Sequence, residues 1–142
     1  MSKHLLRGCH ILLAVVILGL ANSRPAAATE PSPCIDLSGH WSGTWKDCGS
    51  GHHGPLHATF CRTDDCHYHV VFSGRFWGIF PFRFKAELNV AGQQGDRLSL
   101  SGTQRAGISG TFEYNASASN CDFSATFDSK RYHGVFELTR DR

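Results

Sequence analysis

Apolar and polar residues alternate along most of the chain after residue 36, and no segment there shows the 3.6-residue period of an amphipathic helix. The clearest case runs from Phe82 to Val90, where apolar side chains fall on one face and Arg, Lys, Glu and Asn on the other. This alternation is typical of a strand with one buried face. The same test predicts seven further strands, over residues 37–46, 56–60, 68–76, 98–101, 108–114, 122–128 and 132–138.

Turn-forming residues separate these segments, at residues 49–55, 92–96, 106–107 and 117–120. Because the connections are short, consecutive strands are expected to pair as antiparallel hairpins. We therefore predict an all-β fold, an eight-stranded antiparallel up-and-down meander that forms a closed or nearly closed barrel without exposed edges. A two-sheet β-sandwich satisfies the same alternation and is the alternative. Glycines that follow serine permit tight coiling of the strands: Gly39, Gly43, Gly74, Gly102 and Gly110.

The first 28 residues have the order of a secretory signal peptide. Lys3 and Arg7 precede an apolar run over residues 11–21, and alanines at 26–28 supply the small residues for cleavage after Ala28. The run is too short for a membrane span, which needs about 20 apolar residues. No transmembrane span is therefore expected after cleavage. The predicted organisation is a signal peptide (1–28), an N-terminal linker (29–36) and a single β-barrel domain (37–142).

Removal of the signal peptide changes the charge and the cysteine count. Lys+Arg falls from 14 to 11, because three of these residues lie in the first 28, while Asp+Glu stays at 12, so the net charge moves from +2 to near −1. That balance excludes a general basic field for nucleic acid or an anionic membrane. The predicted location is secreted or periplasmic, where disulfides are the default for the five remaining cysteines. Their odd number leaves at least one unpaired within the chain.

The segment Cys34-Ile35-Asp36-Leu37-Ser38-Gly39-His40-Trp41 resembles the opening strand of avidins, and its Gly39-His40-Trp41 is also similar to the Gly-x-Trp start of lipocalins. Both families are calycin-like barrels, so the resemblance implies an eight-stranded meander that holds a small ligand. The chain departs from avidins at Gly43, where avidins carry a polar biotin contact. It also lacks the late tryptophans of the avidin pocket, since its last tryptophan is Trp77. The resemblance supports the architecture and argues against biotin.

A meander sorts its loops between two ends, and here the two rims differ in composition. The rim formed by the loops after the first, third, fifth and seventh strands is rich in histidine, cations and aromatic residues, whereas the opposite rim is polar to acidic. The first rim contains Cys48, His52, His53, His57, Trp77, Gly78, Pro81, Arg105, Lys130, Arg131 and His133. The second contains Asp64, Asp65, Gln93, Gln94, Asp96, Asn115 and Asn120, with Cys34, Cys61, Cys66 and Cys121 nearby.

The composition of the first rim predicts an exported, non-enzymatic ligand- or partner-binding module, because small barrels present ligand sites at their mouths. No nucleophile elbow, phosphate loop or His-Glu-x-x-His stretch is present, so no enzyme is expected. The partner is a small molecule or an envelope or extracellular component, and nucleic acid is not expected. The alternative is a structural cell-envelope domain whose core is filled by inward aromatic residues. The residues assigned to the binding rim are Phe76, Trp77, Phe80, Phe82, Arg105, Arg131 and His133.

The cysteines carry two further expectations. A C-x3-H-H-x3-H spacing is formed by Cys48, His52, His53 and His57. Because thiolate and imidazole suit zinc or copper, binding of one of these metals by this loop is a second alternative function. The competing interpretation is a flexible loop in which the histidines are only polar residues. Otherwise no cofactor is expected. The predicted disulfides are Cys61–Cys66 across a hairpin and Cys34–Cys121 between the terminal segment and the seventh strand, with Cys48 unpaired. The longer bridge would stabilise the domain by about 4 kcal/mol in the chain-entropy model.

Overall fold

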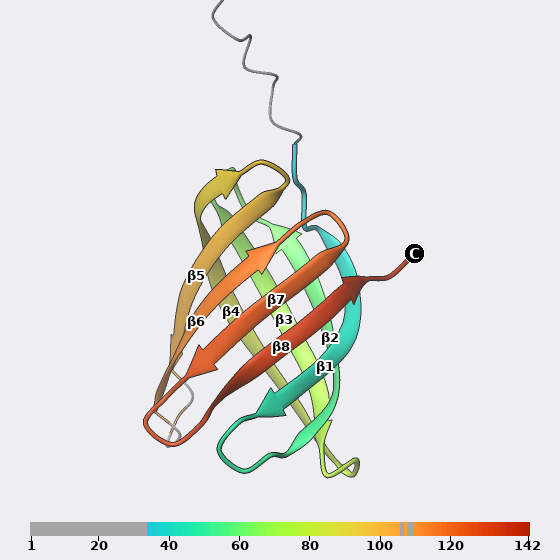
Figure 1. Cartoon of the computed structure of the whole chain (residues 1–142), viewed down its shortest axis with the longest axis vertical. Coiled ribbons are helices and arrows are strands. Elements are labelled where there is room, and N and C mark those ends of the chain that lie inside the picture. Colours follow the sequence, from blue (N-terminus) through green and yellow to red (C-terminus); the bar gives the residue numbers. More distant parts are fainter. Residues whose placement is uncertain (1–33, 106, 108–109) are drawn as a thin grey trace, which may run out of the picture. The chain divides into compact units, whose positions relative to one another are not determined.

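A computed structural model describes residues 34–105, 107 and 110–142. The predicted signal peptide and Ile108 of the sixth predicted strand lie outside the described residues. Each strand pairs antiparallel with the next, and the first pairs with the last, so the sheet closes into a barrel (Figure 1). The strands are β1 (Gly39–Asp47), β2 (His53–Arg62), β3 (His67–Phe76), β4 (Phe80–Gln94), β5 (Arg97–Arg105), β6 (Thr111–Ala118), β7 (Asp122–Asp128) and β8 (His133–Arg140).

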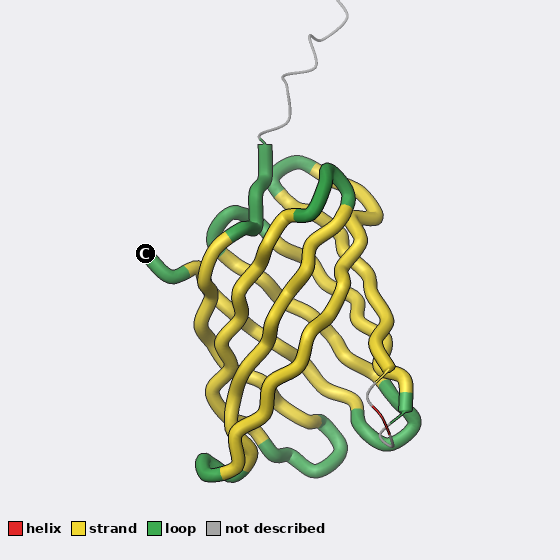
Figure 2. The backbone as a smooth tube through the Cα atoms, turned by 180° about the vertical axis from the view of Figure 1, so that it is seen from behind, coloured by secondary structure: helices red, strands yellow, loops and turns green. Residues whose placement is uncertain are grey.

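The closed meander confirms the predicted all-β architecture and excludes the two-sheet sandwich. Figure 2 shows strands on every side of the barrel, so no sheet edge is left free. No helix in the described part of the chain is long and apolar enough to cross a membrane. Within the described residues, every strand pair and every buried core residue lies between Ile35 and Arg140. Residues 29–142 therefore contain all eight described strands, and we expect them to fold as a unit.

Glycine permits the close contact of β1 with β8 that completes the barrel. Gly43 pairs with Leu138, and a Cβ atom on Gly43 would lie 1.9 Å from the carbonyl oxygen of Glu137. A Cβ atom on Gly134 would likewise lie 2.0 Å from the carbonyl oxygen of Lys46. Since no side chain fits at these distances, the two strands approach each other only because these positions lack one.

The inner face fills one half of the barrel with large apolar side chains. Trp41, Phe60, Tyr68 and Phe123 are fully buried there, and the ring centroids of Phe60 and Phe123 lie 5.1 Å apart. We call this half the filled end; it includes the β2–β3, β4–β5 and β6–β7 loops. Its interdigitated rings leave little of their apolar surface in water, which makes this half the main source of stability.

The N-terminal segment covers the filled end. Ile35 and Leu37 are buried, so the packed structure includes a residue that the sequence assigned to the linker. The backbone N–H of Leu37 donates to the Tyr68 hydroxyl at 3.3 Å, and Trp41 Nε1 donates to the Leu37 carbonyl at 2.9 Å. The Arg140 guanidinium lies 4.7 Å from the centre of the Trp41 ring and donates to backbone carbonyls of the same segment. These contacts seal one mouth of the barrel.

Candidate functional site

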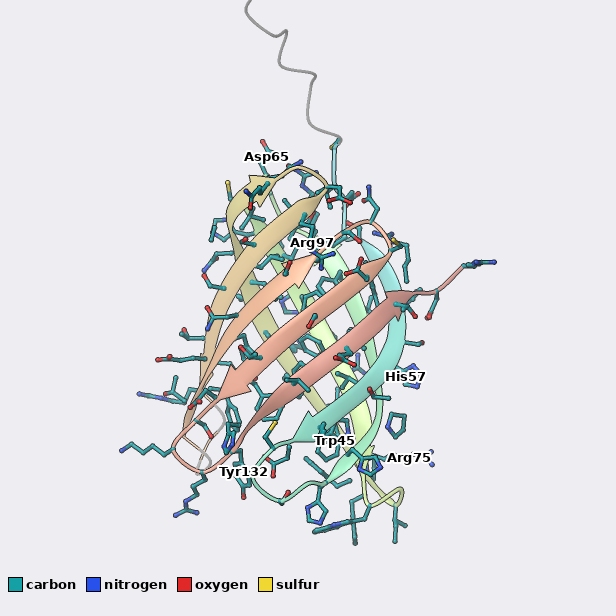
Figure 3. The ribbon with its side chains drawn as sticks, in the orientation of Figure 1. Trp45, His57, Asp65, Arg75, Arg97 and Tyr132 are labelled. Atoms are coloured by element: carbon teal, nitrogen blue, oxygen red, sulfur yellow. The ribbon has the colours of Figure 1, made fainter. Side chains whose placement is uncertain are left out.

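The other half of the barrel contains a cavity of about 700 Å³ that opens between the β1–β2, β3–β4 and β7–β8 loops. We call this the open end, formed by residues 48–52, 77–79 and 129–132. Small-molecule sites occupy roughly 300–1,000 Å³, so the cavity is large enough for a ligand. Figure 3 shows Trp45 and Tyr132 at this end and Asp65 and Arg97 at the filled end.

One wall of the cavity is a ladder of nearly parallel aromatic rings. From β4 to the β7–β8 loop its members are Phe82, Phe84, Tyr114, Phe112 and Tyr132. Neighbouring centroids are 6.1–6.5 Å apart, and neighbouring planes differ by no more than 19°. Rings in this arrangement present faces and edges to a planar apolar molecule.

The ladder crosses from β4 to β6 past β5, which has a glycine opposite Tyr114. Gly102 pairs with Tyr114 in the β5–β6 register, and a Cβ atom on Gly102 would lie 2.3 Å from the carbonyl oxygen of Glu87 on β4. The missing side chain lets β5 approach the β4 backbone closely at this point. The rings of Phe84 and Tyr114 lie 6.4 Å apart.

The cavity lining also contains buried polar atoms without partners. Within the described residues, such side-chain atoms are Trp45 Nε1, Asp47 Oδ1 and Gln104 Oε1, and all three residues line the cavity. An unsatisfied buried polar group costs about 1–3 kcal/mol, so a donor or acceptor supplied by a bound molecule would relieve that cost. The lining therefore combines a large apolar surface with a few polar positions, as small-molecule sites do.

Asp47 has a second role, because its carboxylate holds the β1–β2 loop. Its Oδ2 accepts hydrogen bonds from the backbone N–H of Ser50, at 2.9 Å, and from the Ser50 hydroxyl. The bond from the Ser50 side chain is the main reason that the pKa of Asp47 lies below its usual value. The carboxylate is therefore ionised at neutral pH and gives the polar side of the cavity a negative charge.

Two loops meet at the rim through His52 and Trp77. Trp77 Nε1 donates to His52 Nε2 at 3.1 Å, and the two rings lie edge to face with centroids 5.4 Å apart. This contact joins the β1–β2 loop to the β3–β4 turn across the edge of the mouth. It explains how an exposed tryptophan at a hairpin tip becomes part of the cavity lining.

The turn that carries Trp77 holds it in an unfavourable backbone conformation. Trp77 has φ 50° and Gly78 has φ 72°, and the Ile79 N–H donates to the Phe76 carbonyl at 3.1 Å, as in a type I′ turn. Asn or Gly is the usual residue at the first of these positions, since a left-handed conformation costs other residues about 1–2 kcal/mol. Trp77 in this conformation therefore lowers the stability of the barrel.

We expect Trp77→Asn to raise the free energy of unfolding by about 1 kcal/mol, because asparagine tolerates a left-handed φ. The same substitution removes an indole from the cavity lining and should weaken ligand binding severalfold. Urea unfolding measures the first effect and dye titration the second. A variant less stable than the wild type would indicate that the His52 and Phe80 contacts of the indole outweigh the strain.

Burial of Tyr114 gives the site a pH signature, since it raises the pKa of this phenol to about 12. An unfolded tyrosine ionises near pH 10, so between about pH 10 and 12 the unfolded chain loses a proton that the folded chain keeps. Stability should therefore fall in this range by up to about 3 kcal/mol. In Tyr114→Phe the contribution of Tyr114 to this alkaline loss should disappear, while a smaller loss from Tyr68 remains, because burial also raises the pKa of that phenol. Urea midpoints at about pH 8 and about pH 11 measure the difference. Tyr132→Phe, at a half-exposed rim position, is the matched control and should retain the loss.

The structure brings together only part of the predicted binding rim. Phe76, Trp77, Phe80 and Phe82 all line the cavity. Arg105 ends β5, Arg131 lies in the β7–β8 loop and His133 begins β8; all three are at the open end, outside the cavity lining. Sequence reasoning did not assign Trp45, Phe84, Gln104, Tyr114 or Tyr132 to the site. Alternation already placed Trp45, Phe84 and Tyr114 on the inner face, which was the available signal.

The predicted metal-binding set is not brought together. His57 lies on the outer face of β2, where its Nδ1 is 3.1 Å from the Ser42 hydroxyl. His52 packs against Trp77, and His53 Nδ1 lies 3.3 Å from the Gly51 carbonyl oxygen. Across the described residues, no three or more His, Cys, Asp or Glu side chains form a group that could hold a metal ion.

All five cysteines in the described residues have free thiols, so neither predicted disulfide is formed in this structure. The strand register separates Cys61 from Cys66. Strands β2 and β3 pair as far as Arg62 with Tyr68, which places Cys61 opposite His69 instead. Pairing of β2 with β3 therefore continues one residue past Cys61, and Cys66 lies in the loop and not opposite Cys61.

The segments that carry Cys34 and Cys121 do lie together at the filled end. The backbone N–H of Asp36 donates to Asn120 Oδ1 at 3.2 Å, two residues from Cys34 and one from Cys121. The Cys34–Cys121 bridge stays a prediction, which peptide mapping under non-reducing conditions can test.

Together the fold and cavity define a closed eight-stranded antiparallel barrel with one filled end and one open aromatic cavity. Comparison with family models finds no match, and no curated protein matches the chain. A solved structure of a de novo designed fluorescence-activating β-barrel is similar, with a TM-score of 0.52 and 13% identity over 74% of this chain and 94% of that chain. This likeness supports the barrel fold. The finer resemblance to avidins and lipocalins stays a prediction.

Proposed function

We propose that the protein is an exported, non-enzymatic carrier that binds a flat, mostly apolar small molecule at its open end. The observation that supports this function best is the cavity itself, about 700 Å³ in volume and walled by stacked aromatic rings. A structural domain with a filled core would have side chains in this space. Here only the filled end is packed in that way.

The polar atoms of the lining narrow the class of ligand. Gln104 Oε1 and Asp47 Oδ1 are acceptors, and Trp45 Nε1 is a donor. A ligand with a hydroxyl or amine donor on an otherwise aromatic or polycyclic frame would satisfy an acceptor while its rings lie against the ladder. An anionic group on the ligand would be repelled by the Asp47 carboxylate and would be accommodated only near Arg83, which also lines the cavity.

Two measurements test this proposal. Native mass spectrometry of protein purified from its source should detect a bound small molecule. A fluorogenic, planar aromatic dye should bind purified residues 29–142 with increased emission; the designed barrel similar to this chain is described as fluorescence-activating, which motivates this probe. Absence of both a co-purifying ligand and dye binding would refute the carrier function.

Neighbouring residues on one hairpin supply a matched pair of variants for the dye assay. Phe80 is exposed and lines the cavity, whereas Ile79 is exposed and does not. Phe80→Ala should raise the Kd of the dye about tenfold, the effect of losing one aromatic contact of about 1.4 kcal/mol. Ile79→Ser should leave the Kd unchanged. Equal effects of the two substitutions would place the dye outside the cavity.

A further inference from the structure

The open end carries large apolar side chains that are exposed in the part of the chain that the structure describes. Within the described residues, those that are exposed all belong to this end, four on the β3–β4 hairpin and one in the β7–β8 loop: Phe76, Trp77, Ile79, Phe80 and Tyr132. Trp77 is 64% exposed and Ile79 is 73% exposed. Figure 1 shows this hairpin at the lower end of the barrel, away from the N-terminal segment. Exposed apolar side chains gathered at one end of a barrel are typical of a surface that contacts another molecule or a membrane.

Positive charge lies on the β3–β4 hairpin and on the other loops of the open end, and it forms no ion pair within the described residues. In the described residues, the ion pairs of arginine join Arg62 to Asp65 at 3.1 Å and Arg97 to Asp122 at 2.7 Å, both at the filled end. The cations of the open end make no ion pair in the part of the chain that the structure describes: Arg75, Arg83, Arg105, Lys130 and Arg131. They are therefore available to an anionic partner.

The acidic groups at the open end are few and leave this charge largely intact. Asp47 is buried and bonded to Ser50, while Glu113 and Asp128 face each other across β6 and β7. The filled end carries the larger acidic set: Asp36, Asp64, Asp65, Asp96 and Asp122. Charge is thus separated along the barrel axis, which gives the open end a local basic field although the net charge of the mature chain is near −1.

We propose that the open end docks on an anionic lipid surface, with Trp77 and Ile79 inserted among the headgroups and Arg75, Arg83 and Arg131 facing the phosphates. Tryptophan is enriched at membrane–water interfaces, where its amphipathic ring lies at headgroup level. Basic residues next to inserted apolar ones add electrostatic attraction to anionic lipids. A narrow hairpin tip fits a deformable lipid surface better than a flat protein face.

Docking in this orientation turns the mouth of the cavity toward the lipid. An apolar ligand would then pass between the bilayer and the barrel without crossing water. The docking itself rests on surface side chains, and only the transfer step rests on the proposed carrier function. The two therefore fail separately in experiment.

The test is binding of purified residues 29–142 to vesicles of phosphatidylcholine alone and of phosphatidylcholine mixed with phosphatidylglycerol, followed by co-sedimentation and tryptophan emission. The anionic vesicles should bind the protein and shift its emission to shorter wavelength, because Trp77 is the exposed tryptophan, whereas Trp41 and Trp45 are buried. Ile79→Ser should weaken vesicle binding about tenfold, from lost apolar contact. Arg131→Gln should weaken it about fivefold.

Arg142→Gln is the control for charge, since it removes one positive charge beyond the end of β8 near the filled end, and it should bind anionic vesicles as the wild type does. Binding should also fall as ionic strength rises. Absence of binding to anionic vesicles, or equal binding by Ile79→Ser and the wild type, would overturn the proposal. Binding to soluble polyphosphate but not to vesicles would also overturn it and would indicate a soluble acidic partner. Normal dye binding by Ile79→Ser would confirm that docking and ligand binding were measured separately.

Discussion

Gly43→Ala is expected to destabilise the barrel by about 3 kcal/mol, which is a large part of the stability of a domain of this size. The added Cβ would lie 1.9 Å from the carbonyl oxygen of Glu137 and 2.8 Å from Cα of Leu138. Both atoms belong to the backbone of β8, so no side-chain rotation relieves the clash. The β1–β8 pair must separate, and this pair closes the barrel. Urea unfolding followed by circular dichroism measures the loss.

Gly92→Ala is the matched control for this prediction. A Cβ atom at Gly92 would meet nothing within 4 Å. Replacing that glycine restricts the unfolded chain and should leave stability unchanged or raise it by about 0.5 kcal/mol. If both variants unfolded at the same urea concentration, the prediction would be wrong, and the barrel would not depend on close contact between β1 and β8 at Gly43.

The strand pattern could be predicted from the sequence because one face of each strand is buried, and burial imposes alternation on the residues. Ends of strands were harder to predict. Strand β4 continues to Gln94, beyond the predicted Val90, because its last residues pair with β5 across an irregularity between Val90 and Gly92. These residues are exposed, so hydrogen bonding, without any apolar pattern, extends the strand.

The cavity could not be predicted from alternation. Trp41 and Trp45 both face inward from β1, yet Trp41 lies in the filled end and Trp45 lines the cavity. Their sequence signals are the same. What separates them is whether the side chains from all eight strands fill the cross-section at that level, and this depends on strand tilt and stagger around the whole barrel.

The aromatic residues of the predicted rim line the cavity, whereas its cations do not. Phe80 and Phe82 line the cavity because they flank a tight turn at its mouth. Arg105 and Arg131 lie at the open end, outside the cavity lining, because the direction of a loop side chain depends on local backbone geometry that no periodicity encodes. Their position outside the cavity is what leaves them available to an external anionic surface.

Trp41 and Trp77 allow the effects of substitution on stability and on ligand binding to be measured separately. The larger effect on stability is expected for Trp41→Ala. We expect it to lower the free energy of unfolding by about 4 kcal/mol, as deletion of a fully buried aromatic side chain does. Trp41 is 0% exposed, lies 5.6 Å from the Phe60 ring and supports the Arg140 guanidinium on its face. Its loss would leave a void under the N-terminal segment and remove the hydrogen bond to the Leu37 carbonyl.

Trp77→Asn is the matched comparison, because Trp77 lies at the opposite mouth of the barrel and is largely exposed. Urea unfolding should show a large loss of stability for Trp41→Ala and a small gain for Trp77→Asn. Dye titration, at a temperature where both variants are folded, should show the reverse order: a severalfold rise in Kd for Trp77→Asn and little change for Trp41→Ala, which does not touch the cavity. If Trp41→Ala abolished dye binding while still folded, the filled end would be part of the site, and the division of the barrel into two halves would be wrong.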